Sequence, residues 1–402
     1  MKILLGCILR SLCLATFIIC FFVGCDENIG DSYEEQLLHL HKKVGDRLFH
    51  IRDPRIYLFG MGNERKILYK RGVLSDYFTN EVIYRSKDFI SDSIIPDRYS
   101  VIIRKSDGND TIREDERGLF INKKLLHKRK ETIHLPTFDS YKYGKVMRVL
   151  LQEVLFNVKD HTPFPALATY RNPFYRDAAY AGMVLKETGN LAIIKPWVES
   201  LDSIYDHARS YDYNEADNLG ELLYLKSLFP RLKNTAIVDA VQKEANRISI
   251  NENGERWLKG KVDYADKDVY ATKWYIFGLK SLNLPSKGWR SPSMFDDYAN
   301  LFWMDEDHSM PTINDVKLAY IEWNSIHRFL KNVFLYPYLS NARAHYYGKL
   351  SWVVMNDLRY PLSWEGESLN NFHENPNRVS APHLWAAAEL FLFLSEYKSK
   401  ER

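Results

Sequence analysis

From about residue 140 onward, hydrophobic residues recur every three to four positions, which is the period of a helix with one buried face. Segments rich in Gly, Pro, Asn and Asp separate these stretches. The pattern predicts helices over residues 141–158, 174–188, 191–209, 215–229, 233–248, 268–283, 293–303, 324–346 and 380–398. The last of them contains HLWAAAELFLFL, which is apolar almost all the way round and is therefore expected to be buried.

The pattern is different between residues 46 and 140. Short runs of β-branched and aromatic residues, such as IYLFG, EVIYRS and YSVIIRK, alternate with turn-forming residues such as Gly62-Asn63 and Asp107-Gly108. This alternation predicts a small β-rich N-terminal domain over residues 46–140. Residues 26–45 are predicted to be a tether with a short amphipathic helix, and residues 141–402 a helical domain.

Short links between successive helices predict antiparallel helical hairpins. Acidic and aromatic residues recur together before several helices, in RNPFYRD, YDYNEADN, DYADKDVYATKW and YPLSWEGE. A simple bundle gives no reason for this recurrence, whereas a two-layered ring collects such helix ends around a central funnel. The predicted fold class is therefore mainly α, a toroid of helical hairpins preceded by a small strand-rich section.

The four cysteines lie at positions 7, 13, 20 and 25, and none follows in the rest of the chain. Lys2 and Arg10 precede an apolar run from Leu12 to Val23, which is short for a membrane-spanning helix and fits a signal peptide over residues 1–25. The segment Phe22-Val23-Gly24-Cys25 resembles a bacterial lipobox. The sequence thus predicts a lipid on Cys25 and a membrane-anchored lipoprotein outside the cytoplasm, in the periplasm or at the cell surface. An uncleaved N-terminal anchor is the alternative.

The composition is that of an ordinary globular protein, with 46% hydrophobic, 27% charged and 14% aromatic residues and a net charge of +3. No long basic run is present, so nucleic acid is not a predicted partner. The sequence contains no P-loop, dinucleotide fingerprint, HExxH motif or serine nucleophile elbow. Neither a metal nor a cofactor is predicted.

An Arg-Asp pair stands at the start of an otherwise apolar helix in YRNPFYRDAAYAGMVL, residues 170–185. Arg176 and Asp177 offer charged hydrogen bonds to a sugar diol, and Tyr175 or Phe174 offers a face on which a sugar can stack. The alternative is a salt bridge between Arg176 and Asp177 that fixes the entry into the helix. We predict that these three residues bind substrate.

A second helix start, in YDYNEADNLGELLYL, carries Glu215, Asp217 and Asn218. Helix capping alone explains such residues, since acidic groups are stabilised near the free N–H groups of a helix N-terminus. The functional alternative is a carboxyl group held at a cavity edge, where it protonates a leaving oxygen. We predict Glu215 or Asp217 as a catalytic acid and Asn218 as a binding residue.

The segment YPLSWEGESLNNFHENPN, residues 360–377, contributes Glu365 and Glu367 beside Trp364. A solvated acidic loop is the alternative, but an aromatic neighbour desolvates a carboxyl group and raises its pKa toward neutrality. Trp274, in DVYATKWYIFGL, is a candidate cavity aromatic or a core residue. We predict Glu365 and Glu367 as catalytic, and Trp364 and Trp274 as sugar-binding.

Two carboxyl groups from distant parts of a chain that face each other across a cavity are what glycoside hydrolysis requires. The order of RNPFYRDAA, NEADNLGELLY, YATKWYIFGL, SWEGE and PHLWAAAELFLFL is similar to the six-hairpin glycosidase superfamily, which includes glucoamylase-like and trehalase-like enzymes. The resemblance covers residues 145–400. It implies an (α/α)6 toroid with an acid mid-chain, Glu215 or Asp217, and a base near the last hairpins, Glu365 or Glu367. The tryptophan-glutamate acid motif of glucoamylases is missing.

Three functions remain open at this point. The first is a lipid-anchored glycoside hydrolase acting on oligosaccharides or polysaccharides by a two-carboxylate mechanism. The second is a non-catalytic lipoprotein that binds glycans or a partner protein. The third is a polysaccharide lyase, for which Arg343, His345 and Tyr346 supply a cation and candidate bases.

Overall fold

The structure is a computed structural model that describes residues 32–33, 35–36, 56–209, 212–230, 235–263, 265–292, 352–355 and 379–395. The predicted lipidation site at Cys25 lies outside the described residues, as do Trp364, Glu365 and Glu367. The predicted helices 293–303 and 324–346 also lie outside them. Among the described residues, no helix is both long enough and apolar enough to cross a membrane.

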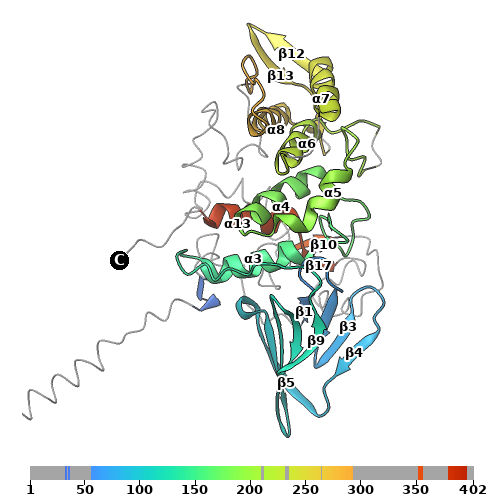
Figure 1. Ribbon diagram of the computed structural model, residues 1–402, viewed down its shortest axis with the longest axis vertical. Helices are drawn as coiled ribbons and strands as arrows, with labels where there is room; N and C mark the ends of the chain where they lie inside the picture. Colours follow the sequence, from blue (N-terminus) through green and yellow to red (C-terminus); the bar gives the residue numbers. More distant parts are fainter. Residues whose placement is uncertain are drawn as a thin grey trace, which may run out of the picture.

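Two antiparallel meanders form the N-terminal part (Figure 1). The first sheet has the order β1-β2-β3-β4, with strands β1 (Ile56–Phe59), β2 (Ile67–Lys70), β3 (Val73–Asp76) and β4 (Val82–Arg85). The second has the order β5-β6-β7-β8-β9, with strands β5 (Phe89–Ile95), β6 (Ser100–Lys105), β7 (Gly108–Asp115), β8 (Gly118–Ile121) and β9 (Lys124–Lys128). A 3-10 turn, η1 (Pro96–Arg98), joins β5 to β6.

The first sheet is covered on both faces, because strand β1 is buried along its whole length. Tyr57 and Phe59 pack into a core shared with β6, β7 and β8, whereas Ile56 and Leu58 pack into the core of the helical part. Successive side chains of a strand point to opposite faces. The first sheet therefore lies between the second sheet and the helices, which explains why IYLF is a continuous apolar run rather than an alternating one.

The helical part is a stack in which chain order and spatial order differ (Figure 1). The final helix packs against α3 and α4, α4 packs against α6, and α6 packs against α8. Helix α13 is enclosed by neighbours, and its described apolar residues, such as Leu384, Leu390 and Phe391, are buried in the core of the helical part. The helices are α3 (Gly144–Phe156), α4 (Tyr175–Glu187), α5 (Lys195–Ser200), α6 (Asn218–Ser227), α7 (Thr235–Ile248), α8 (Asp268–Ser281) and α13 (Leu384–Ser395).

Helices α6 and α8 cross in direct backbone contact at two glycines. A Cβ atom placed on Gly220 meets the carbonyl carbon of Trp274 at 2.1 Å, and one placed on Gly278 meets the carbonyl oxygen of Gly220 at 2.5 Å. Real Cβ atoms do not approach other atoms so closely. The close crossing therefore depends on both residues lacking a side chain.

The prediction of a mainly α toroid is wrong for the described residues, which form this helix stack with six separate antiparallel sheets. Besides the two meanders, there are four two-stranded sheets: β10 (Val158–Lys159) with β11 (Thr162–Pro163), β12 (Ser249–Glu252) with β13 (Glu255–Leu258), β14 (Lys261–Val262) with β15 (Ala265–Asp266), and β16 (Trp352–Met355) with β17 (Val379–Pro382).

One predicted helix is also absent as a single element. Residues 191–209 form a 3-10 turn, η2 (Leu191–Ile194), and the short α5, and then continue without regular structure. Here hydrogen bonds to another part of the chain replace helical ones. The hydroxyl group of Tyr175 donates to the carbonyl oxygen of Ser203. The carboxylate of Asp206 accepts from the backbone N–H of Tyr175. Helix periodicity alone does not anticipate this competition.

Candidate functional site

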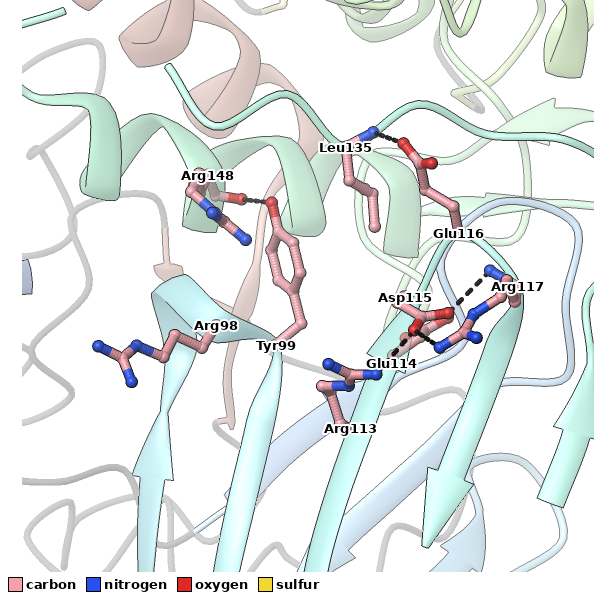
Figure 2. Close-up of a pocket in the computed structure, with 9 residues that line it drawn as sticks. All are labelled: Arg98, Tyr99, Arg113, Glu114, Asp115, Glu116, Arg117, Leu135 and Arg148. Carbon is pink, nitrogen blue, oxygen red and sulfur yellow. Dashed lines mark hydrogen bonds and ion pairs between the residues drawn. The ribbon is translucent and has the colours of Figure 1, made fainter. Parts of the chain in front are cut away.

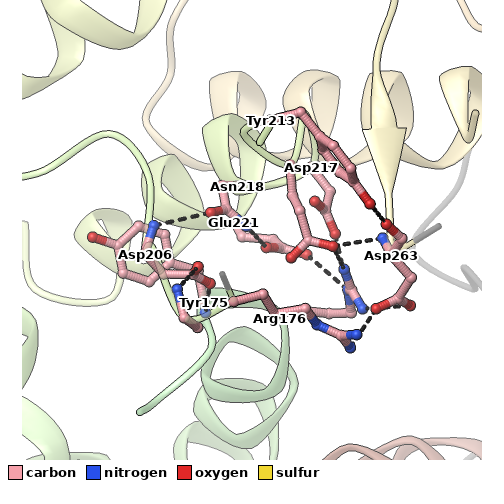
Figure 3. Close-up of polar contacts among 11 residues, drawn as sticks. Tyr175, Arg176, Asp206, Tyr213, Asp217, Asn218, Glu221 and Asp263 are labelled. Carbon is pink, nitrogen blue, oxygen red and sulfur yellow. Dashed lines mark hydrogen bonds and ion pairs between the residues drawn. The ribbon is translucent and has the colours of Figure 1, made fainter. Parts of the chain in front are cut away.

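Arg176 lies in the first turn of α4, and its side chain is only 2% exposed. The Nε atom is 2.9 Å from Asp217 Oδ2, Nη1 is 3.1 Å from Asp263 Oδ2, and Nη2 is 3.3 Å from Glu215 Oε1 (Figure 3). Glu221 Oε1 is a fourth carboxyl neighbour, 3.8 Å from Nε. We call Arg176, Glu215, Asp217, Glu221 and Asp263 the Arg176 cluster.

Three elements deliver these side chains to one place. Helix α4 brings Arg176, the start of α6 brings Glu215, Asp217 and Glu221, and the β14–β15 turn brings Asp263. Two side chains hold the backbone of this turn in place. The N–H of Asp263 donates to the carboxyl group of Glu215, and the hydroxyl group of Tyr213 donates to the carbonyl oxygen of Asp263. Helix α13 adds Trp385, whose ring centroid lies 5.3 Å from Arg176 Cζ.

Helix capping does not account for the acidic residues at the start of α6. Asp217 occupies the N-cap position, yet its side chain makes no capping hydrogen bond and turns to Arg176 instead. Asn218 likewise contacts other parts of the site: its side-chain oxygen accepts from the backbone N–H of Asp206, and its amide donates to Glu221 at 3.3 Å. The polar residues here are therefore organised around the guanidinium group.

The Arg176 cluster has more carboxyl groups than guanidinium groups, even though Arg209 also forms an ion pair with Asp263. Burial raises the pKa of Glu215 and Asp217, and nearby Arg176 only partly opposes this effect. Burial, and then the charge of Asp217, raise the pKa of Glu221 well above its usual range. The arrangement therefore favours retention of at least one carboxyl proton near neutral pH.

Asp177 follows Arg176 in α4 and is buried beside the cluster. Its Oδ1 atom lies 3.7 Å from Nδ1 of His383. Burial, opposed by Arg176 and Arg209, raises the pKa of Asp177 to about 7, and burial together with Arg209 lowers the pKa of His383 to about 4. The imidazole is therefore neutral at pH 7, and the two side chains are a polar contact rather than an ion pair.

We expect Asp177→Asn to change how stability depends on pH. The folded state holds the Asp177 proton up to about pH 7, whereas the unfolded chain releases it near pH 4, so this group lowers the stability of the native protein as pH rises between these values. Asparagine removes the titration. The free energy of unfolding of the variant, relative to the native protein, should rise over this interval by up to about 1.4 kcal/mol per pH unit.

Urea denaturation at several pH values between 4 and 8 measures this difference. Asp139→Asn, at an exposed position, is the matched control. Parallel stability profiles for the native protein and Asp177→Asn would show that Asp177 does not titrate in this range.

A small cavity adjoins the Arg176 cluster. It has a volume of about 40 Å³ and is lined by residues of the α6 start and of the preceding loop, namely Tyr205, Asp206, His207, Ala208, Arg209, Tyr213, Asn214, Glu215 and Asn218. Such a cavity has room for water but not for a sugar ring. Glu215 belongs to both the cavity and the cluster, whereas Asp217 is fully buried against Arg176.

The structure brings together Arg176, Asp177, Glu215, Asp217 and Asn218 of the predicted residues, and it buries the two predicted aromatic residues, Trp274 and Tyr175. Trp274 is fully buried, with ring contacts to Tyr180, Tyr224, Tyr270 and Phe277. Tyr175 is 3% exposed, and its hydroxyl group donates to the carbonyl oxygen of Ser203. Core packing covers both rings in this structure, so sugar stacking on either of them stays a prediction that would require the core to open.

Sequence reasoning missed Glu221, Asp263, Arg209, Asp206 and His383. Glu221 stands four residues after Asp217, a spacing that places both on one side of a helix, and this could have indicated it. The other residues come from loops and from the start of the last helix, and no sequence spacing relates them to Arg176. Within the described ranges, no group of His, Cys, Asp and Glu side chains is arranged to hold a metal ion.

Comparisons of the chain with protein-family models, with curated proteins and with solved structures each found no match.

Proposed function

We propose that the Arg176 cluster is the acid-base part of a carbohydrate-cleaving site, and that the protein is a glycoside hydrolase acting on oligosaccharides or polysaccharides. The observation that carries this proposal is the position of Glu215. It is a carboxyl group with a raised pKa that lines a cavity and is held by Arg176 and by the backbone N–H of Asp263. A general acid needs a retained proton and a fixed orientation, and Glu215 has both. Because the cavity holds water but no sugar ring, the proposal requires it to widen when a substrate binds.

In this mechanism Glu215 gives its proton to the glycosidic oxygen as the bond between that oxygen and the anomeric carbon breaks. Asp217, which is fully buried and bonded to Arg176 Nε, positions the guanidinium group and does not reach the substrate. Water supplies the hydroxyl group of the new reducing end, and its remaining proton goes to the carboxylate that acts as the base. Glu365 or Glu367 is our candidate for the second carboxyl group, and both lie outside the described residues. A separation of about 6.5–9.5 Å from Glu215 would predict inversion, and about 5–5.5 Å retention.

We further propose that the protein is attached to a membrane, outside the cytoplasm, by a lipid on Cys25. Metabolic labelling with a radioactive fatty acid tests this attachment independently of activity. Label that is present in the native protein and lost in Cys25→Ser would support it, and equal labelling of both would refute it.

Glu215→Gln is expected to lower kcat on a cleaved oligosaccharide by about 10²- to 10⁴-fold, because glutamine keeps the shape of the side chain but has no proton to donate. The assay incubates purified protein with neutral and acidic oligosaccharides and measures new reducing ends. Glu255→Gln is the matched control. Glu255 lies in β13, is 43% exposed and forms an ion pair with Arg290. Unchanged activity of Glu215→Gln, with cleavage by the native protein, would remove Glu215 from the mechanism.

A non-catalytic glycan-binding protein is the second candidate, and one observation favours it. All the carboxyl groups of the cluster contact the same guanidinium group, which is also how a purely structural ion-pair network is built. Binding of an oligosaccharide without cleavage would support this candidate. Products that absorb as unsaturated sugars would instead indicate a lyase, whose candidate residues Arg343, His345 and Tyr346 lie outside the described residues.

A further inference from the structure

A larger cavity lies where the second sheet meets α3, away from the Arg176 cluster (Figure 2). Its volume is about 410 Å³, which is within the usual size range of small-molecule sites. Four arginines line it: Arg98 after β5, Arg113 on β7, Arg117 in the β7–β8 turn and Arg148 on α3. Tyr99 and Leu135 complete the wall together with three consecutive acidic residues, 114–116.

Two of the three carboxyl groups are committed to the fold. Glu114 is 3% exposed and accepts from the backbone N–H groups of Gly60 and Met61, both at 2.9 Å, and from Arg129 at 2.8 Å. Glu116 accepts from the backbone N–H of Leu135 at 2.8 Å. The negative charge of Glu114 is thus balanced by Arg129, which does not line the cavity, and does not offset the charge of the cavity arginines.

The third carboxyl group is shared by two arginines. Asp115 Oδ2 lies 3.0 Å from Arg113 Nη2 and 2.9 Å from Arg117 Nη2, so one carboxylate holds two guanidinium groups at the rim (Figure 2). The arrangement leaves the rim with excess positive charge.

The remaining two arginines have no such partner. Within the described part of the chain, no carboxylate lies within ion-pair distance of Arg98 or Arg148. Tyr99 places Arg148: its ring centroid lies 4.9 Å from Arg148 Cζ, and its hydroxyl group donates to the carbonyl oxygen of Arg148 at 3.2 Å. The Nε atom of Arg148 is buried and has no hydrogen-bond acceptor among the described residues. The cavity therefore offers positive charge that no carboxylate of the described residues pairs.

We propose that this cavity binds the charged group of an acidic ligand, a carboxylate, sulfate or phosphate, between Arg98, Arg148 and the Arg113–Arg117 pair. Guanidinium groups match the oxygen atoms of such groups in geometry as well as in charge. The same charged group can come from a free inorganic anion or from an acidic sugar, and the cavity has room for a sugar ring beside it.

The test measures binding to purified full-length protein by isothermal titration calorimetry at low ionic strength. The probes are inorganic phosphate, sulfate, a galacturonic acid trisaccharide and maltotriose, which is a neutral sugar of the same length. At least one acidic probe should bind, and binding should weaken with added sodium chloride because the contacts are ionic. Maltotriose should not bind at this cavity.

Arg98→Gln and Arg148→Gln should each weaken binding of the acidic probe by about tenfold or more. Arg98 is exposed, so its replacement leaves the fold intact, and thermal unfolding checks both variants. Arg290→Gln, at an exposed arginine outside the cavity, is the control and should bind as the native protein does. Equal affinity for phosphate and for the galacturonic acid trisaccharide would show that the cavity recognises the charged group alone. Tighter binding of the trisaccharide would show that the cavity also contacts the sugar. Failure of every acidic probe to bind, or the same affinity in Arg98→Gln and Arg148→Gln as in the native protein, would overturn the proposal.

Discussion

Replacing Arg176 with methionine is expected to destabilise the folded protein by about 3–5 kcal/mol at pH 8. Methionine keeps much of the buried volume but removes the positive charge that Glu215, Asp217 and Asp263 surround. Buried carboxylates without a partner must either stay charged at high cost or take up protons. The loss should therefore be smaller at pH 5, where protonation is easier, and urea denaturation at the two pH values measures it.

Arg290→Met is the matched control for this prediction. Arg290 also forms an ion pair, with Glu255 at 2.6 Å, but its side chain is 60% exposed. Exposed pairs contribute about 0–1 kcal/mol, so this variant should be close to the native protein. Similar losses for the two variants, or no pH dependence for Arg176→Met, would argue against the Arg176 cluster as the electrostatic centre of the helical part.

Gly220→Ala is expected to have the other large effect, a loss of about 3 kcal/mol or more of folding free energy. The added methyl group overlaps the backbone of Trp274 in α8, and neither helix can yield by a side-chain rotation. The helices must separate, which disturbs the start of α6 and with it Glu215 and Asp217. Chemical denaturation measures the stability, and the oligosaccharide assay should show a parallel loss of any cleavage.

Gly182→Ala separates this steric effect from helix propensity. Gly182 is also inside a helix, α4, but the one atom of the described residues that an added Cβ atom there approaches too closely is Cδ1 at the end of the Leu228 side chain, at 2.7 Å. That side chain can rotate, and alanine gains up to about 1 kcal/mol of helix propensity over glycine. The Gly182 variant should thus be much less affected. If the Gly220 variant were equally mild, α6 and α8 would not cross as closely as described.

The helix positions follow closely from sequence periodicity where a segment has its own apolar face. The expected helices 174–188, 233–248 and 268–283 correspond to α4, α7 and α8, which begin and end within two residues of those limits. The strands β12 and β13 were not expected, although Asn253-Gly254 marks their turn. Both residues have positive φ angles, 53° and 79°, which is the conformation that two-residue hairpin turns require.

The sequence predicts only some of the residues of the candidate site. The Arg-Asp pair in α4 and the acidic start of α6 are polar residues in apolar surroundings, and that contrast marked Arg176, Glu215 and Asp217. Asp263, which contacts Arg176 and Glu215, lies in a turn whose neighbours give no such contrast. Trp274 was ambiguous because an aromatic residue has the same periodicity in a core as beside a ligand, and only its enclosure by other rings assigns it to the core.

By itself, the sequence determined the positions of helices such as α4, α7 and α8, that short strands precede the helices, and which polar residues stand at helix starts. These features depend on neighbours a few positions apart, so local spacing carries them. Only the tertiary structure decided that the helices form a stack over two sheets rather than a ring, and that one guanidinium group gathers four carboxyl groups. Those outcomes depend on which buried faces cover one another, and residues far apart in the chain can satisfy the same local pattern in many arrangements.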